Sequence, residues 1–166
     1  TAWKSAQRII KQRNAMLKTQ CNKQGLSIWD KDLAAHGETL HQLRKTYIDN
    51  LTPLFLEMAE NIAATPHQDL TLKYNKGWHE QLSLAKALDK SFGQDSLKGY
   101  THVGPHRSSV QVQINNQPAQ LLLSKGQQKC LVCALRLAQS ALFDQTSSTQ
   151  CLFLLDDIAA ELDTHH

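Results

Sequence analysis

The chain has 166 residues, 41% of them hydrophobic, which is enough for one compact domain or two small ones. No apolar run approaches the roughly 20 residues of a membrane-spanning helix, and no signal peptide opens the sequence; a cytoplasmic protein with reduced thiols is therefore expected. The net charge of +3 does not by itself identify a nucleic-acid-binding protein. Because the sequence starts without Met and stops abruptly at His166, we expect a piece of a longer protein.

The first 20 residues have the periodicity of an amphipathic helix, with apolar side chains along one side. Basic residues fall on the opposite side, within an arc of about 80° at roughly 100° per residue: Lys4, Arg8, Lys11 and Lys18. On an isolated helix such a stripe is more often a solvated face than a binding face. Arg13 breaks the pattern, because it points into the apolar side, where a guanidinium needs a partner.

A second, longer helix is expected after a turn at N-K-Q-G, residues 22–25. Pro53 should kink or restart this helix, with Thr52 placed to cap the restart. The two helices predict an antiparallel hairpin whose apolar seam packs within the molecule. The seam is expected to contain residues spaced mostly by three and four: Leu33, Leu40, Leu43, Tyr47, Leu51, Leu54, Met58 and Ile62.

The middle of the chain predicts two strands and a short helix. D-L-T-L-K-Y, residues 69–74, and S-V-Q-V-Q-I, residues 109–114, alternate with period two, and N-N-Q-P after the second indicates a turn. Between them a helix is expected at about residues 81–92. The last third predicts a helix at residues 125–143, a polar connector, and a buried strand at C-L-F-L-L, residues 151–155.

The four cysteines do not predict a metal site. Cys130 and Cys133 form a C-x-x-C, which we interpret as two helix positions one turn apart. A zinc site would need a second pair of ligands, and the nearby candidates, His165 and His166, are terminal. Two terminal histidines do not show whether they are native or the start of a tag.

The segment L-S-K-G-Q-Q-K, residues 123–129, opens the helix of the last third with residues suited to phosphate. Ser124 at the N-cap and Gln127 three residues later match a capping box. Gly126 has no side chain to keep an anion from the backbone N–H groups, and Lys125 adds a charge to the helix dipole. A well-capped helix without a ligand explains the same residues, so this motif alone leaves both interpretations open.

Two carboxylates, Asp156 and Asp157, follow C-L-F-L-L. A buried strand that ends in this way is typical of a Walker B segment, which holds Mg²⁺ through water and positions an attacking water beside the γ-phosphate of ATP. The alternative is a core strand that ends in an acidic turn. The next segment, A-A-E-L-D, ends at Asp163. The order of these segments resembles the signature motif, Walker B segment and D-loop of ABC-type ATPases.

Three segments narrow this resemblance to the RecF family of bacterial DNA repair and replication proteins: T-A-W-K-S-A-Q-R-I-I-K-Q-R-N-A-M-L-K, T-H-V-G-P-H-R and L-S-K-G-Q-Q-K-C-L-V-C-A-L-R-L-A-Q. The resemblance runs in order from Thr1 to Asp163. It implies an α/β (α+β) fold, in which a helical hairpin, the lid (residues 1–97), joins part of an ABC-type P-loop ATPase head (residues 98–166). It also implies ATP-dependent homodimers that bind DNA, as duplex or at single/double-strand junctions, and work with RecO and RecR.

By this resemblance, Ser124 and Gly126 would contact the γ-phosphate of ATP held by the other subunit. The same loop would be lined by Lys125, Gln127 and Gln128. ATP with Mg²⁺ is the implied cofactor. The resemblance also favours DNA contact by the basic stripe of the first helix, because sequence-independent DNA binding rests mainly on phosphate contacts.

The acidic residues near the end would have three roles. Asp156 would be the metal-associated carboxylate, and Asp156 and Asp157 together would be the catalytic pair. Most ABC ATPases have glutamate where this chain has Asp157, and the shorter side chain implies slow hydrolysis. Asp163 would lie at the dimer interface.

Two features depart from the family pattern. Ser108 and Ser109 follow G-P-H-R, where the family usually carries acids, so charge pairing by that loop is in doubt. A structural turn explains His106 and Arg107 at least as well as a functional role does. No G-x-x-x-x-G-K-[ST] motif occurs, so this chain alone is not expected to hydrolyse ATP, whereas its parent is.

Two other functions remain to be weighed. An ABC transporter ATPase subunit would share the signature and Walker B segments, but a long basic hairpin is not expected in it. A non-enzymatic helical module that binds DNA or protein would explain the missing phosphate-binding loop most simply. It leaves the three ordered motifs unexplained.

Overall fold

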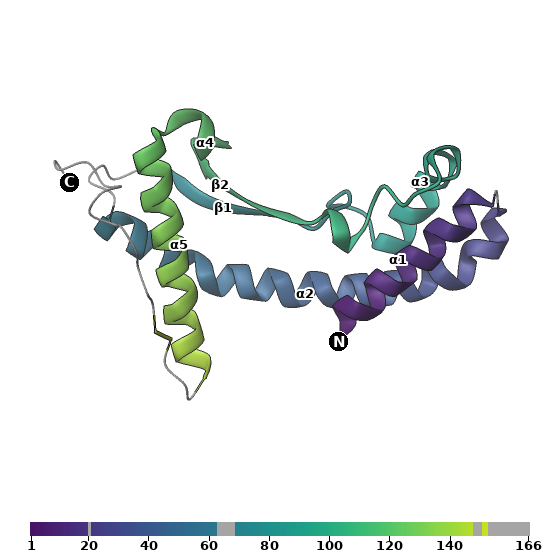
Figure 1. Cartoon of the computed structure of the whole chain (residues 1–166), viewed down its shortest axis with the longest axis horizontal. Coiled ribbons are helices and arrows are strands. Elements are labelled where there is room, and N and C mark those ends of the chain that lie inside the picture. Colours follow the sequence, from purple (N-terminus) through teal and green to yellow (C-terminus); the bar gives the residue numbers. More distant parts are fainter. Residues whose placement is uncertain (20, 63–68, 148–150, 153–166) are drawn as a thin grey trace. The chain divides into compact units, whose positions relative to one another are not determined.

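The computed structural model describes residues 1–19, 21–62, 69–147, 151 and 152, which form helices and a three-stranded sheet (Figure 1). Contacts divide the chain into two compact units. Unit 1 comprises residues 1–46 and 74–110, and unit 2 comprises residues 47–73 and 111–166. The boundary expected after residue 97 concerns the lid and head, and it stays a prediction.

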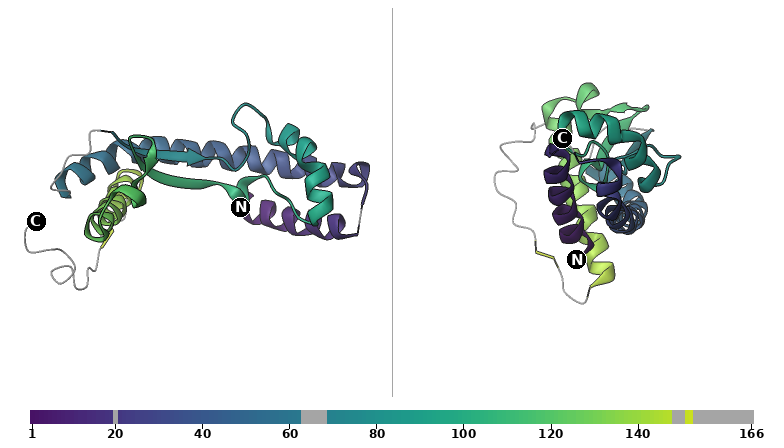
Figure 2. Two further views of the ribbon diagram at one scale, coloured as in Figure 1. Left: turned by 90° about the horizontal axis from the view of Figure 1, so that it is seen from above. Right: turned by 90° about the vertical axis from the view of Figure 1, so that its right-hand side faces the viewer.

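Unit 1 is built from α1 (Ala2–Lys18), the first part of α2 (Lys23–Ile62) and α3 (Leu84–Lys98) (Figure 1 and Figure 2). The apolar faces of these helices share one core, which confirms that the predicted hairpin packs within the molecule. Buried residues of this core are Ala6, Ile9, Ile10, Leu33, Leu40, Trp78, Leu84, Ala87 and Leu88.

The beginning of α2 differs from the prediction. The turn expected at residues 22–25 is absent there, because α2 already begins at Lys23. The side-chain oxygen of Asn22 accepts the N–H of Gly25 at 2.9 Å, as an N-cap residue does. Asparagine and glycine here start a helix instead of separating two.

Of the kink or restart expected at Pro53, the restart is wrong, because α2 continues through this residue for 40 residues in all. Thr52 does not cap a new helix; its hydroxyl donates to the carbonyl oxygen of Ile48 at 2.7 Å. Proline removes one helix hydrogen bond and crowds the preceding turn. Burial of Leu51 and Phe55 on either side supports the helix against that cost.

The apolar seam of α2 is only partly as predicted. Leu33, Leu40 and Leu51 are buried, whereas Leu43 and Tyr47 are 62% and 43% exposed. An α-helix drifts by about 20° per heptad relative to a strict seven-residue repeat. Over a helix of this length the buried side therefore moves to neighbouring positions, here to Ile48 and Phe55.

The helix α3 is longer than the one expected at residues 81–92. Ser83 caps its start by accepting the N–H of Lys86, and Gly99 ends it in the left-handed conformation with φ 72°. Gly93 lies inside the helix without ending it. Glycine inside a helix costs about 1 kcal/mol relative to alanine, which packing of the apolar face offsets here.

The sheet confirms both predicted strands: β1 (Leu70–Asn75) and β2 (Ser109–Ile114). The strand order is β1-β2-β3, and β3 (Gln117–Pro118) pairs antiparallel with β2, with Ile114 opposite Gln117. Asn115 and Asn116 have φ angles of 51° and 61°, as the two-residue turn of a β-hairpin requires. The turn predicted at N-N-Q-P is therefore confirmed.

After the hairpin, the short helix α4 (Ala119–Leu122), which was not predicted, leads into α5 (Lys125–Thr146). The start of α5 is as predicted and its end lies three residues beyond the expected one. Most of the strand expected at residues 151–155 lies outside the described residues. Among the helices that the structure describes, none combines the length and apolar character needed to cross a membrane.

Candidate functional site

The first candidate site is the N-terminal turn of α5 in unit 2. Ser124 adopts an extended N-cap conformation, and its hydroxyl oxygen accepts the N–H of Gln127 at 3.3 Å. In return, the side-chain oxygen of Gln127 accepts the N–H of Ser124 at 3.0 Å. The predicted capping box is therefore confirmed, and it fixes the backbone of this turn.

This turn presents donors to solvent. The N–H groups of Lys125 and Gly126 have no acceptor within the described residues, as is usual in a first helical turn. A Cβ placed on Gly126 would meet only the Ser124 hydroxyl oxygen, at 4.0 Å. The chain itself therefore does not need glycine at this position, because an added Cβ would have room there.

Gln128 has a positioning role inside the chain. Its side-chain amide donates to the carbonyl oxygens of Gln120 at 3.1 Å and Leu123 at 2.9 Å. These bonds tie α4 and the connection that follows it to the first turn of α5. Of the residues expected to line the loop, Gln127 and Gln128 are thus engaged locally, whereas Ser124 and Lys125 are exposed.

The acidic half of the predicted site lies outside the described residues. It comprises Asp156, Asp157 and Asp163, whose roles stay predictions. Within the part of the chain that the structure describes, no group of three or more His, Cys, Asp or Glu side chains could hold a metal ion. Cys130 and Cys133 are free thiols on α5.

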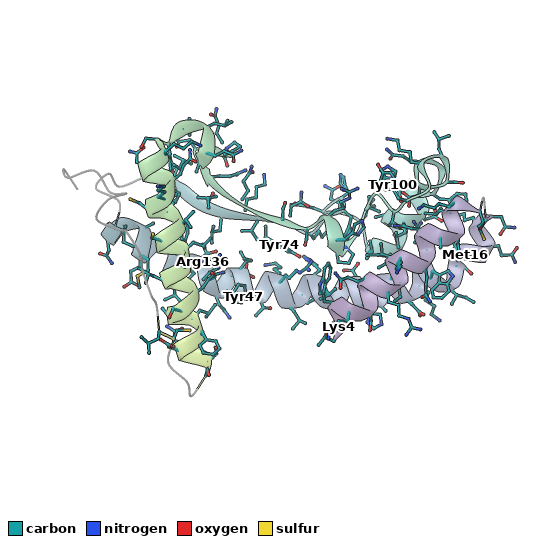
Figure 3. All side chains as sticks on the ribbon, viewed as in Figure 1. Lys4, Met16, Tyr47, Tyr74, Tyr100 and Arg136 are labelled. Atoms are coloured by element: carbon teal, nitrogen blue, oxygen red, sulfur yellow. The ribbon has the colours of Figure 1, made fainter. Side chains whose placement is uncertain are left out.

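The second candidate site is the basic face of α1 in unit 1. Its members are exposed and make no hydrogen bond or ion pair with any other described residue: Lys4, Arg8, Lys11 and Lys18. Figure 3 labels Lys4 near the beginning of this helix and Met16 near its end. Four cations without counter-ions on one helical face are available to an anionic partner.

Arg13, on the opposite side of α1, has the polar partners that its position predicted. It is fully buried, and its Nε donates to Asp30 at 2.6 Å. Its Nη1 donates to Asp95 at 2.7 Å and to the Thr101 hydroxyl at 2.9 Å. The guanidinium thus ties α1 to α2, to α3 and to the segment after α3.

Asp95 is the residue that sequence reasoning missed. Its side chain is completely buried, and besides Arg13 it accepts from the Ser91 hydroxyl at 3.0 Å. It is also within 3.0 Å of the backbone N–H and 2.8 Å of the Nδ1 of His102. Four bonds to one carboxylate satisfy a charge that would otherwise be costly to bury. The signal in the sequence was Arg13, which showed that a partner was needed but not which residue.

The segment G-P-H-R, residues 104–107, forms a fixed corner. Gly104, with φ 139°, donates its N–H to the carbonyl oxygen of Gly77 at 3.0 Å. Arg44 of α2 donates to the Pro105 carbonyl oxygen at 2.7 Å and bonds the Ser108 hydroxyl. These contacts support the structural interpretation of the segment, in which a serine at 108 suffices to accept from the arginine.

His106 is held in this corner as a neutral imidazole. Its Nε2 lies 3.0 Å from the carbonyl oxygen of Thr101, which can only accept, so Nε2 carries the proton. The Nδ1 is buried without a partner among the described residues. Burial lowers the pKa of His106, and the nearby Arg107 acts in the same direction.

We compared the chain with known proteins to find those that it resembles. No family model matches the chain. The DNA replication and repair protein RecF of Vibrio atlanticus (strain LGP32) is 41% identical over 165 residues, which cover 98% of this chain and 45% of that relative. The RecF protein of Shewanella denitrificans is 36% identical over 166 residues, which cover 100% of this chain and 46% of the relative.

A solved structure of the recombination mediator protein RecF with ATP, in the RecFOR pathway, has the same fold. It matches with a TM-score of 0.85 and 24% identity, over 98% of this chain and 46% of that chain. The chain spans just under half the length of the curated relatives it matches. The similarity to those relatives extends over the whole length of this chain, which therefore corresponds to part of a RecF protein.

Proposed function

We propose that this chain is part of an ATP-dependent DNA-binding protein of recombinational repair and replication, and that the first turn of α5 completes an ATP site in a second copy. The observation that carries the proposal is the open turn at Gly126. Its N–H groups are free among the described residues, and no contact of the chain itself explains the glycine. A ligand that must approach the backbone closely does explain it.

The chemistry of the turn suits a phosphate. The Ser124 hydroxyl oxygen accepts the capping bond from Gln127, so its own hydrogen remains available to a phosphate oxygen. The helix dipole places a partial positive charge at the same point, and exposed Lys125 adds a full one. ATP would supply the energy and the γ-phosphate that bridges two copies. The residues of this chain orient that phosphate and hold its charge.

The remaining parts of the proposal rest on the sequence pattern. Asp156 would associate with Mg²⁺ and Asp157 would position the attacking water, while Asp163 would contact the second copy. RecO and RecR would be the protein partners of the complete polypeptide. The RecFOR pathway, to which the similar solved structure belongs, supports the choice of RecO and RecR as partners.

The basic face of α1 would hold DNA by its phosphates. Its four cations are exposed without counter-ions in the described part of the chain, and the buried Arg13 cluster fixes the helix that carries them. Neutralising phosphates releases counter-ions, so such binding weakens as salt rises and does not depend on base sequence.

The experiment on α5 uses the complete polypeptide and measures ATP-dependent dimerisation. Ser124→Arg should abolish dimerisation but leave ATP binding within one subunit largely intact. Gln145→Arg, at the exposed other end of the same helix, is the matched control and should dimerise normally. Dimerisation that survives Ser124→Arg would refute the role in a second copy.

The experiment on α1 measures DNA affinity across a range of salt concentrations. Combined replacement of Lys4, Arg8 and Lys11 by Glu should weaken binding to every DNA sequence and flatten the dependence of log K on log salt, by a slope of about 0.9 per lost phosphate contact. Lys31→Glu, at an exposed position of α2 outside the basic face of α1, is a control that reverses a single charge. Unchanged affinity at all salt concentrations would contradict the DNA-binding role.

A further inference from the structure

An aromatic stack stands in the segment that follows α3. The ring of Tyr100 lies on the imidazole of His102, with centroids 4.1 Å apart and an interplanar angle of 29°. The guanidinium carbon of Arg107 is 5.9 Å from the centre of the Tyr100 ring. Tyr100 remains 37% exposed, and Figure 3 labels it in this segment.

The polar groups at the ends of this stack have hydrogen-bonding capacity left over. The hydroxyl of Tyr100 and the guanidinium of Arg107 make no hydrogen bond with a described residue. Arg107 is exposed, and it lies in a segment whose backbone is held by the corner at Gly104. The structural role of that corner therefore explains the backbone of Arg107 but not its side chain.

The position of Tyr100 is fixed from both sides. Before it, Gly99 ends α3 in the left-handed conformation, and its N–H donates to the Asp95 carbonyl oxygen at 2.8 Å. After it, the backbone N–H of His102 is bound to the Asp95 carboxylate. A ring held in this way loses little conformational freedom when something stacks on it.

The surroundings of Tyr100 are positively charged. The Cγ of Lys18 would lie 3.3 Å from a Cβ on Gly99, so the last cation of the α1 face reaches this segment. Lys98 precedes Gly99 and is exposed, and Arg107 is the third cation. Asp95, near the end of α3, is completely buried and bonded.

We propose that Tyr100 is a stacking site for an unpaired base of DNA, and that Lys18, Lys98 and Arg107 hold the phosphates beside it. This inference rests on the proposed DNA-binding function and adds the kind of DNA that unit 1 recognises. Exposed aromatic rings surrounded by Lys and Arg bind single strands, because every base has a face that can stack and the backbone can be held at the same time. In a duplex those faces are covered by neighbouring bases.

The test compares single-stranded and blunt duplex DNA of equal length, with the complete polypeptide. Tyr100→Ala should raise the Kd for the single strand about 5- to 100-fold, the range expected for one stacked base, and leave the Kd for the duplex within about twofold. Tyr100→Phe, which keeps the ring, should retain the affinity of the unchanged protein. Tyr100→Leu, which keeps an apolar side chain without the ring, should behave as Tyr100→Ala does.

A spectroscopic readout separates stacking from loss of structure. In a series of single strands, each with 2-aminopurine at a different position, the fluorescence at one position should be quenched on binding. The Tyr100→Leu variant should leave the fluorescence at that position unquenched. Far-UV circular dichroism of the same variants checks that α1 and α3 remain folded.

Three results would overturn the inference. If Tyr100→Ala lost affinity equally for the single strand and the duplex, Tyr100 would be a general structural residue. A Tyr100→Phe variant as weak as Tyr100→Ala would assign the contact to the hydroxyl. Unchanged affinity of Tyr100→Ala for every DNA would assign the surface to a protein partner. In each case the proposed function still stands if charge reversal on α1 weakens all DNA binding.

Discussion

Replacing Arg13 with Met tests whether the buried ion cluster holds α1 in place. The variant keeps a long unbranched side chain but removes the charge and three hydrogen bonds, to Asp30, Asp95 and Thr101. Asp95 then remains as a fully buried carboxylate without a cation beside it. Breaking a buried pair in this way costs about 3–5 kcal/mol.

The structure places the expected loss near the lower end of that range. Asp95 would keep its bonds from the Ser91 hydroxyl and from the backbone N–H and Nδ1 of His102. Asp30 is partly exposed and can be hydrated when its partner is lost. We therefore expect the free energy of unfolding to fall by about 3 kcal/mol, a large part of the 5–15 kcal/mol typical of a domain.

Urea denaturation followed by circular dichroism measures this loss. Arg8→Met is the matched control, because Arg8 lies on the same helix, is exposed and is unpaired among the described residues; its loss should stay within about 0.5 kcal/mol. Adding Asp95→Leu to Arg13→Met removes the stranded carboxylate, so the double variant should lose less than the sum of the two single variants. A loss below about 1 kcal/mol for Arg13→Met, or strict additivity, would refute the reasoning.

Two further predictions concern the corner at residues 104–107. Below pH about 6.5 the protein should lose stability, because the pKa of His106 is lowered on folding and the unfolded chain therefore binds the proton more readily than the folded one. His106→Gln should reduce the slope of the unfolding free energy against pH. An unchanged slope would exclude His106 as the cause. Gly77→Ala should destabilise the protein by several kcal/mol, because φ is +96° and an added Cβ would stand 2.2 Å from the Gly104 carbonyl oxygen. A thermal midpoint within 2 °C of the parent, on the order of 0.5 kcal/mol, would contradict that strain.

The sequence predicted the helices and strands well where one local pattern determined them. The capping box of Ser124 and Gln127 placed the start of α5, and alternation placed β2. Pro53 misled because helix-breaking is a local preference, whereas α2 is supported by apolar residues buried on both sides of it. Packing that involves distant residues decides such cases.

The candidate site was predictable to different degrees for the same reason. The basic face of α1 and the turn of α5 lie within single helices, so spacing alone was enough to find them. The cluster around Arg13 could not be assembled, because Asp95 lies 82 positions away along the chain. The stack of Tyr100 on His102 likewise depends on how Asp95 holds Gly99 before the tyrosine and His102 after it.

Two glycines in helices, Gly93 and Gly126, allow a role in stability to be distinguished from a role in binding phosphate. Gly93 and Gly126 both lie in helices, and an added Cβ would meet nothing closer than 4.0 Å at either position. Gly93→Ala should therefore raise the free energy of unfolding by about 0.5–1 kcal/mol and leave ATP-dependent dimerisation unchanged. Gly126→Ala should also be stable, but dimerisation should fail if the phosphate of a second copy approaches this backbone. If the two variants dimerise equally well, the open turn of α5 is a helix cap and the proposed site is refuted.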